Sequence, residues 1–398
     1  MFYPQSERQQ RFIAIAEALA VSFAARAPEH DRDGSFPFEN YDEIRNAGLP
    51  AMIVPESLGG WGANLSDTVM VMGALAGGDG STALSLAMHM QTLGAAAETR
   101  SWPPALFEEV CRAAVQKGAL VNAVATEPEL GSPSRGGKPK TTASLSQSGE
   151  DQQAVWVING RKNFASMSPV LDYFIVPATL QDGNETVARF LIPRGDGISI
   201  EETWDAMGMR TTGSHDLILT DVRTPTANII SRSDSAKPSA GKINAWFMLT
   251  ISAVYVGVAV AALKTAACYA RERVPTALGK PIAELESIQR QLGQAELKLQ
   301  QARMILYHNA ELWDRHPENR AELGMSVAVA KVTATNAAID AVDHCMRVAG
   351  GASMTRNLPL ERYYRDVRGG LTHPVNDEQA LIMLGRHALS NVVAADHS

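Results

Sequence analysis

The stretch "WDAMGMRTTGSHDLILTDVRTP", residues 204–225, lies where the chain changes from helical patterns to strand patterns. Its second half, "HDLILTDVR", is a short apolar run bounded by glycine and proline, so we expect a hairpin here that leads into an edge strand. Four similar runs precede it: "GALVNAVATE", "AVWVING", "DYFIVPATL" and "ARFLIPR". Together they predict a small antiparallel β-domain over about residues 119–230.

Helical patterns occupy both sides of this region. Residues 1–118 are mostly helical by pattern, and "SERQQRFIAIAEALAVSFAARA" has apolar residues at helical spacing after Ser6, a predicted N-cap. Beyond the polar segment 231–242, apolar residues step alternately by four and three: Ile288, Leu292, Ala295, Leu299, Ala302 and Leu306. That seam predicts a helical bundle over 231–398. We therefore expect an α+β fold that is mostly α, with domains at 1–118, 119–230 and 231–398.

Composition narrows the classes of partner. The net charge of −7 and the pI near 5.8 argue against nucleic acid or an anionic membrane as the main partner, although a small anionic ligand remains compatible. The uncharged stretch 243–263 is long enough to span a bilayer, but it holds polar side chains and continues into "KTAACYARERV". We interpret it as a buried bundle helix.

Cysteine and histidine usage points to a reducing compartment and to no metal. The three cysteines lie far apart, the N-terminus lacks a signal pattern, and we expect free buried thiols in the cytoplasm. The nine histidines form no ligand pair at helical spacing, so no metal site is expected.

Three further stretches contain candidate residues for binding a cofactor or a substrate. "VATEPELGSPSRGG" (124–137) leaves a strand and enters a loop whose N–H groups suit a pyrophosphate or a flavin ring. "WVINGRKNFASMSPVLDYFIV" (156–176) predicts a hairpin with "NG" at its turn. "RVAGGASMTRNLPLERYYRDVR" (347–368) combines a helix end, a glycine pair and an Arg-Asp dipeptide.

In this order the stretches resemble the acyl-CoA dehydrogenase superfamily. Its members read "TEPGAGSD", "NGxKxWITN", "MGxRxSxTxxLxFxDVRVP", "GKPIxxxQxIQ" and "GGxGxxxxxPxERxxRD". Here the matching stretches are "TEPELGSP", "NGRKNFASM", "MGMRTTGSHDLILTDVRTP", "GKPIAELESIQ" and "GGASMTRNLPLERYYRD". The resemblance covers about residues 10–390. It implies a helical N-domain, a middle β-domain, a C-terminal four-helix bundle, FAD (or FMN) in the cleft between them, and a homotetramer or homodimer.

The resemblance also implies which residues contact the flavin. The matching positions are Ala125, Thr126, Gly131, Ser132, Phe164, Ser166, Arg273, Gly350 and Gly351. Phe164 stands where the family places a tryptophan beside the flavin ring. Ser166 stands where the family has a threonine hydroxyl, which would donate toward flavin N5.

The family's catalytic glutamate is missing from both of its usual positions. Aligned from the Arg-Asp dipeptide, the common position is Pro374, and the alternative position on the first long bundle helix is Phe247. Met248 falls where an arginine usually follows. A general base must lie within hydrogen-bond reach of the proton that it removes. Ordinary acyl-CoA dehydrogenation is therefore not the expected activity.

Three interpretations remain open, and we favour the first. It is a flavin monooxygenase-like enzyme, since one branch of the superfamily lacks the glutamate and carries histidines near the flavin; His373, His89 and Ser166 would then be catalytic. The second is a divergent acyl-CoA dehydrogenase with Asp377 or Glu378 as base, although helix capping also explains these acids. The third is a non-catalytic subunit of a mixed tetramer. In each case the ligand is a small molecule, and a CoA thioester remains compatible.

Overall fold

The computed structural model describes residues 4–130, 137–147, 154–183, 186–233 and 243–395. The N-terminal part holds helices α1 (Glu7–Asp33), α2 (Phe38–Asn46), α3 (Leu65–Ala76), α4 (Gly80–Thr99) and α5 (Pro104–Lys117). The strands are β1 (Val121–Ala123), β2 (Thr142–Gln147), β3 (Ala154–Ala165), β4 (Tyr173–Leu180), β5 (Val187–Pro193), β6 (Ile198–Glu201), β7 (His215–Pro225) and β8 (Ile229–Ser233). The C-terminal part holds α6 (Ala245–Glu272), α7 (Glu286–Arg315), α8 (Arg320–Ala349), α9 (Leu360–Asp366) and α10 (Asp377–Ala395).

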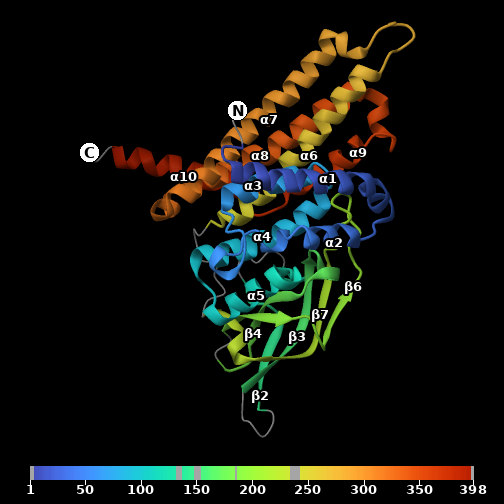
Figure 1. Ribbon diagram of the computed structural model, residues 1–398. Coiled ribbons are helices and arrows are strands. Elements are labelled where there is room, and N and C mark those ends of the chain that lie inside the picture. The colour runs from blue at the N-terminus through green and yellow to red at the C-terminus, as the bar shows by residue number, and fades with distance from the viewer. Residues whose placement is uncertain (1–3, 131–136, 148–153, 184–185, 234–242, 396–398) are drawn as a thin grey trace.

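The elements form a helical, a β and a second helical region in chain order, as the sequence predicted. Figure 1 shows the sheet at one end, the long helices α6 to α8 at the other, and the N-terminal helices between them. The Ser6 side chain caps α1 by accepting a hydrogen bond from the Gln9 N–H at 3.2 Å. That cap was readable from the sequence because serine before an apolar periodic run is a strong helix start.

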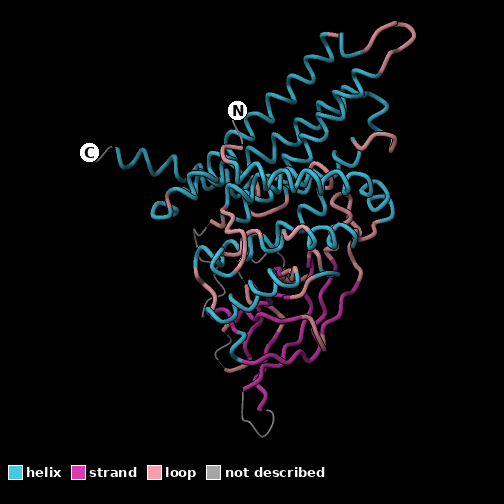
Figure 2. The backbone as a smooth tube through the Cα atoms, in the orientation of Figure 1, coloured by secondary structure: helices cyan, strands magenta, loops and turns pink. Residues whose placement is uncertain are grey.

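The sheet differs from the prediction in two respects. Its eight strands run β6-β7-β3-β2-β4-β5-β8, with β1 beside β4. Most pairs are antiparallel, but β1 and β2 each pair with β4 in parallel, so the sheet is mixed. The run "HDLILTDVR" forms β7, which is not an edge strand because β6 covers its outer side (Figure 2).

The "NG" pair at Asn159–Gly160 does not form the predicted hairpin turn. It lies inside the continuous strand β3, opposite a register irregularity in β7. The Asn159 side chain bonds across the sheet to Asp221, accepting from its N–H at 2.8 Å and donating to its carboxylate at 3.1 Å. A Cβ at Gly160 would lie 2.4 Å from Thr141 Oγ1, so glycine is required by close packing here.

The C-terminal helices follow the predicted seam. Ala295, Leu299, Ala302 and Leu306 are fully buried, and Ile288 and Leu292 are partly buried. Among the described residues, α6 is the one helix long and apolar enough to cross a bilayer, and 78% of its most apolar segment is buried inside the protein. Its interpretation as a core helix is therefore supported.

Helices α6, α7 and α8 pack together, and α10 contacts α8 at its start and then extends away from the three long helices (Figure 1). Leu381 and Leu389 on α10 are 59% and 71% exposed. Of the three thiols, Cys111 and Cys345 are buried as expected, but Cys268 is exposed on the outer face of α6.

Candidate functional site

Phe164 is presented by a bulge near the end of β3. The pairing of β3 with β7 shifts register between Lys162 and Ala165, which places one extra residue in β3. Phe164 itself takes a left-handed conformation (φ 55°), and its ring is 56% exposed, edge-on to Trp204 at 5.9 Å between centroids. A bulky residue in this conformation is strained, and such strain clusters at functional sites. The bulge thus holds an aromatic ring out from the sheet.

Ser166 follows directly after β3 and belongs to a chain of hydroxyl groups. Its Oγ lies 2.8 Å from Ser214 Oγ, which lies 2.7 Å from Thr212 Oγ1. Ser85 on α4 donates to the Thr212 carbonyl at 3.0 Å, so the chain is tied to the N-terminal helices. A hydroxyl combines one donor with two acceptor positions, and Ser166 therefore keeps capacity for a ligand.

Ala125 and Thr126 lie beside the bulge. The Thr126 carbonyl accepts a hydrogen bond from the Asn163 N–H at 2.9 Å, and both Ala125 and Thr126 are half-buried. The structure thus brings together the Ala125–Thr126 segment and the Phe164–Ser166 segment, as the resemblance implied. Gly131 and Ser132 lie outside the described residues.

A buried ion pair, which the sequence analysis missed, supports this arrangement. Lys162 Nζ lies 2.6 Å from Glu127 Oε1, and both side chains are almost fully buried. Glu127 also accepts from the N–H and the hydroxyl of Thr141 at 3.1 and 2.7 Å. Burial opposes ionisation of Glu127, but the hydrogen bonds from Lys162 and Thr141 prevail and lower its pKa. The acid of "TEP" and the lysine of "GRK" were visible in the sequence but gave no sign of their pairing.

Arg273, Gly350 and Gly351 are not joined to this cluster. Arg273 follows α6, in a loop that Figure 1 shows projecting from the far end of the long helices. Gly350 has a left-handed φ of 56°, and a Cβ added at either glycine would meet nothing within 4 Å. No described contact links these three residues to Phe164 or Ser166. The two groups of predicted flavin contacts are therefore separate within one chain.

His89 lies on α4 and is fully buried. The Val121 N–H donates to its Nδ1 at 3.1 Å, so Nε2 carries the proton and donates to the Pro50 carbonyl at 2.9 Å. Burial lowers its pKa to about 4, which keeps the ring neutral. Both ring nitrogens are thus occupied by main-chain groups that join α4 to β1.

His373 lies in the turn between α9 and α10 and contacts α6. Its Nδ1 lies 3.2 Å from the Tyr255 hydroxyl, and its ring lies 6.0 Å from that of Phe247. Burial, with a smaller contribution from the charge of Lys331, lowers its pKa to about 4. Tyr255, which sequence reasoning did not assign to the site, would have been visible only as a polar residue in an apolar helix.

The same turn is anchored by α8. Lys331 is fully buried, donates to the Gly370 carbonyl at 2.9 Å and lies 3.8 Å from Asp377 Oδ1. Asn336 donates to Asp377 Oδ2 at 2.7 Å. The predicted capping role of Asp377 is wrong, because Asn376 caps α10 by accepting from the Gln379 N–H at 3.0 Å. Asp377 instead fixes the turn against α8.

Helices α4 and α6 connect these two clusters. They pack against each other, and Asn244 at the start of α6 donates to Gln91 on α4 at 3.3 Å. Ser85 of α4 holds the Ser166 chain, and Tyr255 of α6 contacts His373. The described interactions include no direct contact between Ser166 and His373.

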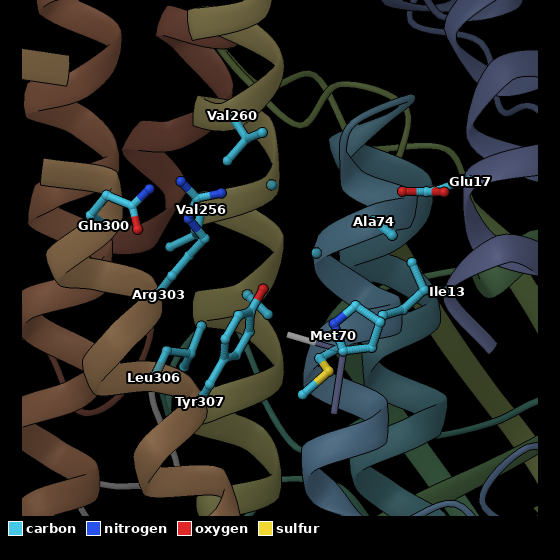
Figure 3. Close-up of a pocket in the computed structure, with 14 residues that line it drawn as sticks. Ile13, Glu17, Met70, Ala74, Val256, Val260, Gln300, Arg303, Leu306 and Tyr307 are labelled. Carbon is cyan, nitrogen blue, oxygen red and sulfur yellow. The ribbon is translucent and has the colours of Figure 1, made fainter. Parts of the chain in front are cut away.

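The pockets lie elsewhere. One of about 320 Å³ is bordered by α1, α3, α6 and α7, with Val256 and Val260 on one wall and Met70 on another (Figure 3). Arg303 at this pocket is paired with Glu296 at 3.2 Å. A second pocket, of about 260 Å³, lies between α1 and the segment 356–363. Neither pocket is lined by any of the predicted site residues.

Comparisons with known protein families and with similar proteins agree with this architecture. Three descriptions match in order: "Acyl-CoA dehydrogenase, N-terminal domain" at residues 6–99, "middle domain" at 122–222 and "C-terminal domain" at 249–378. The Bacillus subtilis (strain 168) protein named "Putative acyl-CoA dehydrogenase YdbM" is 40% identical over 388 residues, which cover 97% of this chain and 99% of that protein.

More distant relatives belong to another branch. The amino sugar nitrososynthase DnmZ of Streptomyces peucetius is 26% identical, over 97% of this chain and 95% of its own length. The X-ray structure of KijD3 with FMN and an amino-keto dTDP-sugar aligns with a TM-score of 0.82 and 25% identity, over 98% of this chain and 95% of that one. The chain belongs to the acyl-CoA dehydrogenase superfamily of flavin-dependent oxidoreductases.

Proposed function

We propose that this flavoprotein is a monooxygenase-like enzyme that oxygenates a small molecule, with His373 at the reaction site. The observation that carries the proposal is the turn 369–377. The two positions at which the family places its glutamate hold Phe247 and Pro374, and the group beside them is an imidazole in contact with Phe247. A dehydrogenase needs a carboxylate to remove the α-proton of its substrate, whereas the N–H of a neutral imidazole can donate a hydrogen bond at neutral pH.

The residues near the bulge fit a flavin ring. The exposed, outward-held ring of Phe164 offers an apolar face, and the Ser166 hydroxyl and the main chain at Ala125–Thr126 offer hydrogen bonds beside it. A bound flavin would supply two-electron redox chemistry. In this proposal Phe164 positions the ring, Ser166 hydrogen-bonds to its edge, and His373 holds a proton at Nε2. His89 is a scaffold residue, since main-chain groups occupy both of its nitrogens.

The phosphate end of the cofactor would need a second copy of the chain. No described contact joins Arg273, Gly350 or Gly351 to the Phe164 cluster within one chain, and α10 leaves apolar side chains exposed. We therefore expect a homodimer or homotetramer in which one copy completes the site of another, with FAD as the cofactor and FMN as the alternative. We also expect a cytoplasmic protein.

A second candidate function is a divergent acyl-CoA dehydrogenase acting on a CoA thioester. It is favoured by the 40% identity to the YdbM protein, whose name gives that activity. Its base would be Asp377 or Glu378. Asp377, however, is held by Asn336 and lies 3.8 Å from the Lys331 ammonium group, which leaves it poorly placed to move toward a substrate.

One experiment separates the candidates. Flavin-loaded protein is mixed anaerobically with a panel of acyl-CoA thioesters, and flavin absorbance is followed. In parallel, externally reduced protein is given ¹⁸O₂ with primary amines and with thioethers, and the products are analysed by mass spectrometry. We expect no bleaching by the thioesters, and ¹⁸O in one of the products.

Three variants sharpen the result. His373→Ala should lower oxygenated product at least tenfold while flavin occupancy is unchanged, and Glu378→Gln, which changes an exposed side chain beside the same turn, serves as the matched control. Bleaching by an acyl-CoA that is lost in Asp377→Asn or Glu378→Gln would overturn the proposal in favour of the dehydrogenase. Failure of the purified protein to bind either FAD or FMN would leave only the non-catalytic subunit.

A further inference from the structure

We propose that Tyr255 and Lys331 are positioning residues that fix the imidazole of His373 so that its Nε2–H, and not Nδ1, is presented to a ligand. Tyr255 holds Nδ1 from α6, and Lys331 holds the turn from α8. The inference rests on the proposed function in one respect, namely that the turn 369–377 borders the reaction site. It adds the orientation and the proton-bearing atom of His373, which the family resemblance does not supply.

Tyr255 acts on the ring itself. Its hydroxyl lies 3.2 Å from His373 Nδ1, and the two rings lie 5.8 Å apart between centroids. Among the described interactions, Nδ1 is the one acceptor available to the buried Tyr255 hydroxyl, and a buried hydroxyl proton without an acceptor is costly. The phenol therefore donates to Nδ1, which places the imidazole proton on Nε2. The part of the chain that the structure describes gives Nε2 no hydrogen-bond partner.

The glycine pair at 369–370 makes this contact sterically accessible. A Cβ at Gly369 would lie 2.8 Å from the Tyr255 hydroxyl oxygen. A Cβ at Gly370 would lie 3.2 Å from the Tyr255 ring and 3.1 Å from Thr335 Cβ. The turn therefore packs directly on Tyr255 because it begins with two residues that lack side chains.

Lys331 acts on the turn. Its ammonium group is fully buried, donates to the Gly370 carbonyl and lies near Asp377 at the start of α10, so it contacts both ends of the segment that carries His373. A buried cation is costly unless it is paired and hydrogen-bonded, which makes this clamp hard to move. Asn336 holds the other oxygen of Asp377.

The charges around His373 favour its neutral form. The ionisable groups packed near it are Tyr255 on α6, Lys331 on α8 and Asp377 on α10. Burial and the Lys331 charge lower its pKa to about 4. Protonation would reverse the Tyr255 bond, because Nδ1–H would then donate to the hydroxyl, and it would set two positive charges close together. At neutral pH His373 is therefore a neutral donor through Nε2.

The protonation of His373 can be tested by exchange of the histidine C2 hydrogen with deuterium. Peptide mass spectrometry then reports the exchange of each histidine separately. The exchange rate changes as the ring titrates, and the measurement needs neither flavin nor substrate. In the wild-type protein we expect no inflection for His373 between about pH 5.5 and 8.5, the range around the ordinary imidazole value. A short unstructured histidine peptide in the same buffers is the reference.

Three substitutions complete the test. Tyr255→Phe and Lys331→Met should each shift the His373 inflection upward by about one pH unit or more, which is at least tenfold in proton affinity. Lys331→Arg keeps the charge and should retain the wild-type profile. Tyr307→Phe is the matched control, because it removes a hydroxyl from α7 at the separate pocket in Figure 3.

The outcomes are distinct. A wild-type His373 inflection at the ordinary imidazole value of about 6.5 would overturn the inference, as would unchanged profiles in both Tyr255→Phe and Lys331→Met. If Lys331→Met does not fold, the conservative Tyr255→Phe variant decides. Absence of oxygenated product in turnover assays, by contrast, contradicts the proposed function and leaves the orientation of His373 to be judged by exchange alone.

Discussion

The main-chain N–H of Met209 donates to Oδ1 of Asp366 at 2.6 Å, across 157 positions of sequence. This bond joins the loop before β7 to the end of α9. Gly208 makes it sterically accessible, since a Cβ there would lie 2.4 Å from the Arg365 carbonyl oxygen. Arg365 in turn pairs with Asp31 at the end of α1 at 2.6 Å. The "MGMR" and "RD" motifs are therefore two halves of one joint between the three regions.

Asp366 should make this joint sensitive to pH. Burial raises its pKa from 3.8 to about 7, so the folded protein holds the proton more tightly than the unfolded chain. The stability that this proton gives is complete below about pH 4 and is lost as pH rises through about 7. Asp366→Asn keeps the acceptor for Met209 and cannot ionise. We expect the wild type to lose about 2 kcal/mol relative to Asp366→Asn between pH 5 and 8.

Thermal unfolding of both proteins across this pH range measures the effect, because contributions from other titrating groups cancel in the difference. The apparent melting temperature of the wild type should approach or exceed that of Asp366→Asn at pH 5 and fall below it at pH 8. Parallel curves for the two proteins would show that Asp366 is ionised throughout, with Arg362 as its counter-charge.

The Glu127–Lys162 pair should be essential for folding of the β-domain. Lys162→Met leaves the Glu127 carboxylate buried without its counter-charge, which costs about 3 kcal/mol. Lys140→Met is the matched control, because its exposed ammonium group lies 3.7 Å from the exposed Glu129 and its main-chain bond to Glu127 is unaffected. Denaturant unfolding should separate the two variants clearly. Equal midpoints would mean that Thr141 and the Lys140 N–H satisfy Glu127 without the Lys162 charge.

The helices and strands with regular apolar spacing were the part of the fold that could be predicted from the sequence. The alternating four-and-three steps in α7 identify its buried side chains, and the short apolar runs locate the strands, because burial imposes these periods. The position of α10 could not be predicted, since its amphipathic pattern does not say whether this chain or another covers it. The "NG" pair was misleading because the same glycine that suits a turn also suits close strand packing.

The site was less accessible to sequence reasoning than the fold. The motifs led to Phe164, Ser166 and His373, but the groups that hold them are Trp204, Ser214, Tyr255 and Lys331. Each of these is a long-range partner chosen by three-dimensional packing, and single sequence spacings contain no such information. His89 is the reverse case. In the sequence a histidine suggests catalysis, and only the structure shows that its ring nitrogens bond to the main chain of Val121 and Pro50.

The glycine pair between α8 and α9 provides a test of the proposed phosphate site. Gly351→Ala introduces a Cβ that meets nothing within 4 Å at a residue without a left-handed φ, so the fold should be unaffected. Flavin occupancy should nevertheless fall if this surface approaches the cofactor of a second copy. Gly208→Ala is the contrasting variant and should lose about 1–3 kcal/mol through its clash with Arg365. Absorbance of bound flavin per chain, read with the melting temperature, distinguishes the two effects, and normal flavin loading in Gly351→Ala would remove that residue from the cofactor site.

Replacing Phe164 by glycine should affect stability and flavin binding in opposite directions. Phe164→Ala and Phe164→Gly both remove the exposed ring, but only glycine relieves the left-handed backbone, so Phe164→Gly should be more stable than Phe164→Ala by about 1 kcal/mol. Both variants should bind flavin at least tenfold more weakly, about 1.4 kcal/mol, because the aromatic face beside the isoalloxazine is gone. Phe164→Trp, which supplies the residue that the family uses, should retain binding. Flavin titration by fluorescence quenching together with thermal unfolding measures both quantities on the same samples. If Phe164→Ala bound flavin as tightly as the wild type, the strain at φ 55° would need another explanation than cofactor binding.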